Sequence, residues 1–423
     1  MTWTPPPRPR WAERLLAHAE SAGGADRLVS LDRDELRRTA ITSSGLDDFG
    51  DDGWLEPFGV FMDALARESD LHLAGRLLVR TELVRTLRNR LRLTDLWTRR
   101  PELLDDEVKE PVFIVGSPRS GTSILHELMA CDRRARAPAM WEMQHPVEAV
   151  TEVGRHAQAG GEAAGDLAAV SDRVVQFSHD LQPEYETMHA NSGYLPNECI
   201  FITMHEFLSD HWGGQHVVPS YDAYLARADH RPAYRFHKKL LQTLQSVGMG
   251  PDGRWLLKAP SHLPQLRALF DVYPDARIVR THRDPLAVLP SALSLLGTLK
   301  WMRCNNVDMS LATRFIPAGF AATYEAEIAD RTSSRVPDDR FVDVQFSELV
   351  ADPVATVARV YERLDRELDD GAREAVAGYA RSKPKGSRGA HVYSLEGMGL
   401  DRAQETERFR FYMDRYGIER EQH

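Results

Sequence analysis

The stretch from Pro111 to Asp132 constrains the fold more than any other part of the chain. Val112–Val115 is a short, β-branched, apolar run, which predicts a buried strand. Residues 116–121, GSPRSG, are too rich in Gly, Ser and Pro to extend a strand or a helix. From Thr122 onward apolar residues recur at helical spacing. A strand, a tight loop and a helix start place backbone N–H groups around an anion, so the sequence predicts an anion-binding loop.

The loop has the spacing of a nucleotide-binding P-loop but lacks its lysine. Gly116 and the triplet Gly121-Thr122-Ser123 match G-x-x-x-x-G-K-[ST], except that Thr122 stands at the lysine position. That lysine reaches the β and γ phosphates of a nucleoside triphosphate, so its replacement argues against an ATPase or kinase. The cation here is Arg119, inside the loop. A P-loop nucleotide kinase or NTPase remains the alternative from another enzyme class.

The segment SPRSGTS resembles the 5′-phosphosulfate loop of sulfotransferases, which use 3′-phosphoadenosine 5′-phosphosulfate (PAPS) and release PAP. The resemblance implies that the loop and the helix start bind this donor through Arg119, Ser120, Gly121, Thr122 and Ser123. The alternative is an ordinary strand-to-helix turn with an arginine on the surface.

A second motif spans residues 254–293. It predicts, in order, a strand at Trp255–Lys258, a helix at Pro264–Tyr273, a strand at Arg277–Thr281 and a helix at Leu286–Leu296. Strands and helices alternating at this spacing imply a parallel sheet with right-handed crossovers. Together with the first motif they predict an α/β fold with a P-loop-like parallel sheet flanked by helices.

Arg283 follows the second of these strands at its carboxyl end, where open α/β sheets bind ligands. Ser291 lies eight residues further on, two turns along the next helix, so both side chains can reach one phosphate. This spacing matches the sulfotransferase element that holds the 3′-phosphate of PAPS, which implies that role for Arg283 and Ser291. Alternatively, Arg283 caps a helix or pairs with Asp284.

Sulfuryl transfer requires cations near the leaving oxygen and a base near the acceptor. We assign the cations to Arg119 and Lys258. Lys258 and His262 resemble the Lys-x-His element of cytosolic sulfotransferases, with two more residues between them, and His262 is the first candidate for the base. Glu142, 23 residues after Arg119, resembles the catalytic glutamate of tyrosylprotein-type members and is the second candidate. The alternative for Glu142 is a structural partner of an arginine.

Two later segments complete the expected donor site. Phe346 begins a stretch that resembles the family's Tyr-Glu-Asp-Leu…Asp-Pro element, whose aromatic residue lies near the adenine. The basic loop around Lys385 and Arg388 lies where cytosolic sulfotransferases carry a loop that contacts the 3′-phosphate. A solvated basic loop is the alternative.

The rest of the chain is predicted to be mainly helical. Residues 1–110 are expected to form a helical N-terminal extension. Residues 111–423 are expected to form the sulfotransferase domain, with a helical insertion on the substrate side at about 145–250. Within the extension, Leu73–Leu96 alternates Leu with Arg. We expect a solvated amphipathic helix there; the alternative is that some of its arginines line the approach to an anionic site.

Composition excludes several function classes. The net charge of -10 argues against a nucleic-acid-binding protein, and three cysteines without a CxxC pair form neither a disulfide framework nor a zinc site. No apolar run approaches the length of a membrane span, so we expect a cytoplasmic protein. The chemistry requires no metal. The acceptor is expected to be a small molecule with a hydroxyl or amine, and its identity is not encoded in these motifs. A non-catalytic PAP-binding protein is a further alternative, and the oligomeric state stays open, a homodimer included.

Overall fold

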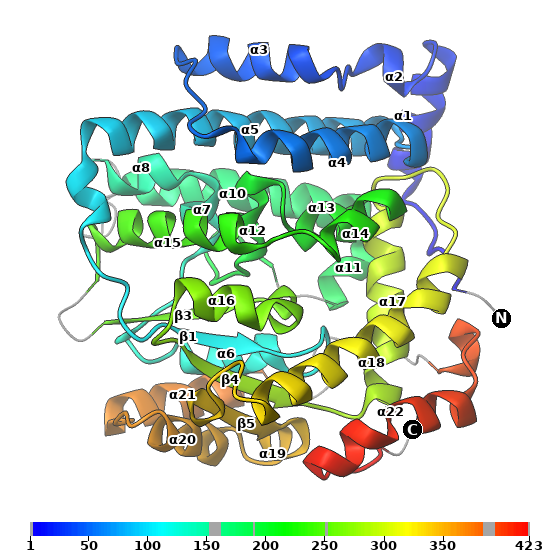
Figure 1. Ribbon diagram of the computed structural model, residues 1–423. Coiled ribbons are helices and arrows are strands. Elements are labelled where there is room, and N and C mark those ends of the chain that lie inside the picture. Colours follow the sequence, from blue (N-terminus) through cyan, green and yellow to red (C-terminus); the bar gives the residue numbers. More distant parts are fainter. Residues whose placement is uncertain (1–2, 152–161, 189–190, 250–252, 384–393, 422–423) are drawn as a thin grey trace.

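The computed structural model describes residues 3–151, 162–188, 191–249, 253–383 and 394–421 (Figure 1). Its centre is a parallel sheet of five strands in the order β2-β3-β1-β4-β5, which confirms the predicted fold class. The strands are β1 (Val112–Val115), β2 (Ala135–Arg136), β3 (Arg254–Lys258), β4 (Arg277–His282) and β5 (Phe341–Gln345).

The strand order places the predicted motifs at one edge of the sheet. β1 lies between β3 and β4, with Val112 opposite both Leu256 and Arg277. The carboxyl ends of these three strands therefore meet, as at the ligand-binding edge of other open α/β sheets. The helix predicted at Pro264–Tyr273 begins instead as the 3-10 helix η4 (Pro260–Gln265) and continues as α16 (Leu266–Val272). Pro264 lacks the N–H that a regular α-helix would use.

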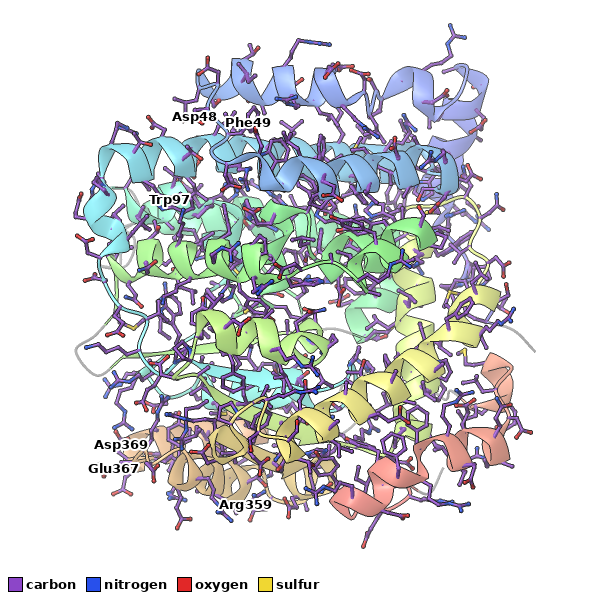
Figure 2. The ribbon with its side chains drawn as sticks, viewed as in Figure 1. Asp48, Phe49, Trp97, Arg359, Glu367 and Asp369 are labelled. Atoms are coloured by element: carbon purple, nitrogen blue, oxygen red, sulfur yellow. The ribbon has the colours of Figure 1, made fainter. Side chains whose placement is uncertain are left out.

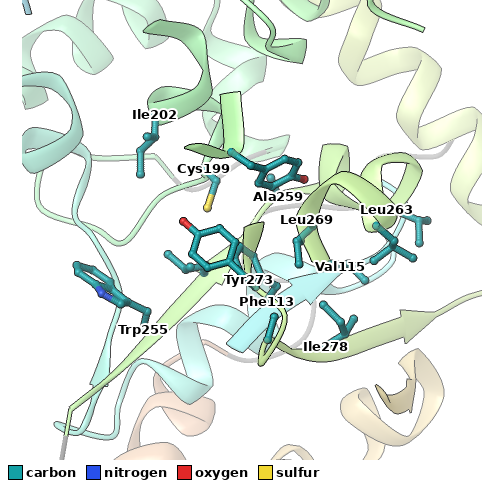
Figure 3. Close-up of a cluster of buried hydrophobic side chains, with 14 of the residues drawn as sticks. Phe113, Val115, Cys199, Ile202, Trp255, Ala259, Leu263, Leu269, Tyr273 and Ile278 are labelled. Carbon is teal, nitrogen blue, oxygen red and sulfur yellow. The ribbon is translucent and has the colours of Figure 1, made fainter. Parts of the chain in front are cut away.

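Both faces of the sheet are buried, as the apolar strands predict. Successive side chains of a strand point to opposite faces. Phe113 and Ile278 pack toward α15 (Arg231–Gln245) and α16, in a cluster with Trp255 and Tyr273 (Figure 3). Ile114 packs on the other face, which is covered by α6 (Thr122–Met129), α20 (Pro353–Arg363) and α21 (Asp370–Ser382).

The N-terminal helices form layers above the sheet domain (Figure 1). They are α1 (Arg10–Ser21), α2 (Ala25–Leu28), α3 (Arg33–Ser44), α4 (Leu55–Glu68) and α5 (Leu73–Arg99). Beneath them lie α7 (Met140–Gln144), α8 (Pro146–Val150), α10 (Glu162–Leu181), α11 (Pro183–Met188), α12 (Ile200–Thr203), α13 (Asp210–Gln215) and α14 (Pro219–Leu225). Trp54 and Phe61 from the extension share one core with Phe207 and Trp212. The extension and the insertion therefore pack as one helical body, and the exact domain limits remain predictions.

The expectation that Leu73–Leu96 forms a solvated helix is wrong. Helix α5 lies between the α3 layer and the helices α8 and η3 (Met204–Glu206), and the side chains of these neighbours pack against it (Figure 2). Arg90 is only 2 % exposed and pairs with Glu206 at 2.5 Å between Nη1 and Oε1. At the end of the helix, the Trp97 indole N–H donates to Thr243 on α15. A buried arginine is tolerated when a carboxylate compensates its charge.

Helices α17 (Pro285–Trp301), α18 (Ser310–Thr332) and α22 (Arg402–Tyr416) flank the sheet beyond β4, and α19 (Phe346–Ala351) follows β5 (Figure 1). Short 3-10 helices occur at η1 (Asp52–Trp54), η2 (Pro101–Leu104), η5 (Asp338–Arg340) and η6 (Glu396–Met398). Within the described ranges, no helix combines the length and the apolar character needed to span a bilayer.

Candidate active site

The loop between β1 and α6 is pressed against the neighbouring strand ends. Gly121 has φ of +95°, and a Cβ built there would lie 2.7 Å from Cδ2 of Phe346. A Cβ on Gly116 would lie 2.2 Å from Oγ1 of Thr281 on β4. The buried Ser120 hydroxyl lies 2.8 Å from the same Thr281 hydroxyl. Only glycine fits at these two positions, because the backbone approaches β4 and α19 so closely.

The two sequence motifs meet in space. Arg119 donates from Nε to Oγ of Ser291 at 3.0 Å, and Arg283 donates from Nη1 to the Arg119 carbonyl at 2.8 Å. Arg119 itself has φ of +69°, which is uncommon for a residue with a side chain. The predicted ligands of the 5′-sulfate end and of the 3′-phosphate are therefore direct neighbours.

Arg283 occupies a position suited to a phosphate. Its guanidinium lies 4.0 Å from the ring centre of Phe346, the predicted adenine neighbour. It also forms a two-pronged ion pair with Glu421, at 2.6 and 2.8 Å. A carboxylate thus fills the guanidinium fork that is predicted to hold the 3′-phosphate, and such forks bind carboxylate and phosphate alike.

Lys258, the last residue of β3, contacts both the helix that follows the loop and Glu198. Its ammonium is buried, with the side chain 3 % exposed, and lies 3.3 Å from Oγ of Ser123. The same nitrogen lies 2.5 Å from Oε1 of Glu198. Lys258 thus lies next to the first turn of α6, and its role as a cation beside the donor stays a prediction.

A cavity of about 230 Å³ adjoins the loop. Arg119, Thr122 and Ser123 form its donor-side wall, and Glu198 lies on the polar side. The opposite wall is largely apolar and comes from α12 and α17, through Ile200, Phe201, Ala292, Leu295, Leu296 and Leu299. This arrangement can hold an apolar molecule with one polar group against the loop.

The structure places His262 outside the described lining of this cavity. The ring is buried and packs edge-on against Phe113, with centroids 5.0 Å apart, and Nδ1 lies 2.8 Å from the Tyr234 hydroxyl. Burial, together with the nearby His237 and Lys258, lowers the pKa of His262 well below its ordinary value. A role for His262 as the base stays a prediction, and an imidazole with a low pKa is a weak base.

Glu142 also lies away from the described cavity lining. On α7 it is buried, forms an ion pair with Arg136, and accepts a hydrogen bond from the Ala139 N–H at 2.8 Å. These contacts match the structural alternative, and a catalytic role remains untested. Lys385 and Arg388 lie outside the described residues. The described part of the chain contains no group of three or more His, Cys, Asp or Glu side chains arranged to hold a metal.

Glu198 is the site residue that the sequence analysis missed. It is one of 63 acidic residues and belongs to no recognisable spacing. Its place follows from a backbone contact between distant segments, in which the Cys199 N–H donates to the Lys258 carbonyl at 2.9 Å. No local sequence signal reports such a contact.

A parallel sheet with a glycine-containing loop after its central strand, flanked by arginine and serine at the same edge, is an arrangement that α/β proteins use to bind anionic ligands. The profile of the Sulfotransferase family matches residues 111–370. The chain belongs to this family.

Solved and curated relatives agree with this assignment. The crystal structure of sulfotransferase STF1 from Mycobacterium tuberculosis H37Rv superposes with a TM-score of 0.75 at 30% identity, covering 89% of this chain and 98% of that one. Sulfotransferase STF9 from Mycobacterium avium shares the fold, with a TM-score of 0.76, 24% identity and coverage of 92% and 98%. The omega-hydroxy-beta-dihydromenaquinone-9 sulfotransferase Stf3 of Mycobacterium bovis is 24% identical over 272 residues. That match covers 60% of this chain and 62% of Stf3, so it spans less than two thirds of the relative.

Proposed function

We propose that the protein transfers the sulfuryl group of PAPS to a hydroxyl or amine of a small acceptor. The observation that carries the proposal is the convergence of Arg119, Ser291 and Arg283, with Arg119 lining the adjoining cavity. A plain nucleotide-binding loop needs neither the second arginine nor the adjoining cavity.

The residues of the site fit the donor. The N–H groups at the start of α6, with Ser123, would hold the 5′ end, and Arg283 with Ser291 would hold the 3′-phosphate. Bound PAPS supplies the sulfuryl group. Lys258 lies within reach of Ser123 and would oppose the charge that grows on the oxygen left behind.

The apolar wall of the cavity favours an acceptor with an apolar body and one hydroxyl. The relative Stf3 is named as a sulfotransferase of omega-hydroxy-beta-dihydromenaquinone-9, a hydroxylated menaquinone derivative. The two observations are independent, since one rests on Leu295, Leu296 and their neighbours and the other on a partial sequence match. We therefore propose hydroxylated apolar compounds as the first acceptors to screen.

Two measurements test this function. Calorimetric titration should show PAP binding well above ATP, with EDTA present. Labelled PAPS should then deliver its sulfuryl group to at least one hydroxylated acceptor. ATP binding as tight as PAP, or a strict need for magnesium, would contradict the proposal and favour the NTPase alternative.

A further inference from the structure

We propose that Glu198 is the general base that takes the acceptor proton, and that Lys258 positions its carboxylate. The proposal rests on the proposed function, because it assumes that the cavity beside the loop receives the acceptor. It differs from both bases expected from the sequence, His262 and Glu142.

The backbone around Glu198 is fixed from two sides. On one side the Cys199 N–H donates to the carbonyl of Lys258 at the carboxyl end of β3, at 2.9 Å. On the other side the Asn197 N–H donates to the Pro138 carbonyl at 3.1 Å. The Asn197 side chain also accepts the Glu198 N–H, at 2.8 Å. Glu198 is therefore held at the ligand-binding edge of the sheet by regular hydrogen bonds, as a preorganised catalytic group requires.

The side chain of Glu198 joins the cavity to the donor loop. It lines the cavity with 15 % of its side chain exposed, and Oε1 lies 2.5 Å from the Lys258 ammonium. The same ammonium lies 3.3 Å from Oγ of Ser123 in the first turn of α6. One continuous contact chain thus runs from the acceptor cavity to the position expected for the 5′ end of the donor.

The two histidines near the cavity are less suited. The imidazole of His262 is sealed against Phe113, as described above. His211 lines the cavity, but its Nδ1 lies 3.1 Å from the Gln215 amide and its Nε2 lies 3.7 Å from Glu82. Asp210 also lines the cavity. Of these two carboxylates, Glu198 is the one with a contact to the Lys258 ammonium.

The proposed step balances as a substitution at sulfur. The acceptor oxygen forms a bond to sulfur while the bond from sulfur to the bridging phosphate oxygen breaks. The electron pair of the broken bond stays on the phosphate of PAP, next to the Lys258 ammonium. The acceptor proton passes to the Glu198 carboxylate and later to solvent, so no oxidant, reductant or metal is consumed.

The test compares acceptors that differ in their need for a base. Water requires deprotonation, and its attack is measured as labelled sulfate released from [³⁵S]PAPS. At about pH 8, 4-nitrophenol is largely ionised and needs no base. Glu198→Gln should lower transfer to water by ~10²–10⁴-fold, the usual contribution of a general base, and transfer to 4-nitrophenol far less. Glu198→Asp should recover part of the loss, and Glu186→Gln, an exposed site on α11, should leave both rates unchanged.

The outcomes separate the base from the function. PAP affinity near that of the wild type shows that Glu198→Gln has folded. An equal loss with both acceptors would indicate a structural role, and an unchanged rate with water would exclude Glu198 as the base. His262→Gln with the selective loss would assign the base to His262 instead. A wild-type protein that binds PAPS but transfers to none of the hydroxylated acceptors screened, 4-nitrophenol and water included, would overturn the proposed function, and this inference with it.

Discussion

In the proposed function, Arg283 binds the 3′-phosphate and so distinguishes PAPS from nucleotides that lack this phosphate. Arg283→Ala should weaken PAP binding by about 2–5 kcal/mol, the cost of truncating one partner of a charged, hydrogen-bonded pair. Affinity for adenosine 5′-phosphosulfate should change little, because that analogue lacks the phosphate in question. Titration of both ligands measures the difference. A mutant that prefers PAPS to the analogue as strongly as the wild type would remove Arg283 from the 3′-phosphate site.

Glu421 competes for the same guanidinium. Binding a 3′-phosphate must displace the Arg283–Glu421 pair, whose side chains are 19% and 30% exposed. A partly exposed pair contributes about 1 kcal/mol or less, so Glu421→Gln should tighten PAP binding by up to about fivefold. In the Arg283→Ala background, Glu421→Gln should leave PAP affinity unchanged, because the guanidinium with which Glu421 pairs is then absent. Equal gains in both backgrounds would point to a general charge effect.

At the scale of single residues, the sequence predicts those site residues whose positions are set by a local motif. Arg119, Arg283 and Ser291 each sit at a fixed offset from a strand end, so the strand–loop–helix spacing places them. Glu198 depends on hydrogen bonds from its neighbours Asn197 and Cys199 to Pro138 and Lys258, which lie 60 residues before and 60 residues after Glu198 in the sequence. A contact of that kind leaves no periodic trace in the sequence.

At the scale of elements, α5 shows where pattern reading fails. The alternation of leucine and arginine predicts an amphipathic helix with one solvent-exposed face. The prediction assumed that the arginines of α5 remain in water, but Arg90 is buried and pairs with Glu206 on η3. The acidic side chain of Glu82 on α5 is also buried, and it pairs with Arg303 on the segment after α17 at 2.8 Å. The strands β1, β3 and β4 and the helices α6 and α17 were predictable because their apolar residues alone define them, whereas the two-residue strand β2 was not predicted.

Removing one partner of these buried ion pairs should destabilise the folded protein. Arg90→Met leaves the Glu206 carboxylate, 4% exposed, without its cation, which should lower the free energy of unfolding by about 3–5 kcal/mol. Arg90→Met combined with Glu206→Gln should recover much of this loss, since no buried charge then remains. Urea unfolding followed by circular dichroism measures both variants. A single mutant as stable as the wild type would show that α5 does not depend on the pair.

At the scale of the whole molecule, the extension and the insertion stabilise each other. Their aromatic side chains share one core, in which Trp54 lies 6.0 Å from Phe207 and Phe61 lies 4.9 Å from Trp212, centre to centre. The sequence predicted both segments as helical, but not that one covers the other. Packing between segments some 150 residues apart depends on complementary shapes rather than on spacing.

The same dense packing buries histidines and makes the stability of the whole protein depend on pH. Burial is the main cause that lowers the pKa of His72, His126, His216 and His237 to about 3, and that of His205 to about 4. In the unfolded chain these rings titrate near their ordinary pKa of about 6.5. Below that pH the unfolded state binds more protons than the folded state, so the free energy of unfolding falls as the pH falls.

The loss should be steep between about pH 6 and pH 4 and absent above about pH 7. Each buried histidine removes up to about 1.4 kcal/mol per pH unit, so several together can exhaust a typical stability of about 5–15 kcal/mol within two units. Paired carboxylates contribute later: the pKa of Asp343 is held well below its ordinary value by Arg331 and His282, so its contribution is lost only below about pH 4. Urea unfolding from pH 8 to pH 5 measures the slope of the free energy of unfolding against pH.

The variant His237→Gln removes one of these titrating rings and keeps a polar partner for the Tyr273 hydroxyl, which lies 2.7 Å from Nδ1 of His237. It should reduce the slope by the contribution of one proton, up to about 1.4 kcal/mol per pH unit. A slope that is flat in the wild type, or unchanged in the mutant, would show that the buried rings do not set the acid limit of the fold.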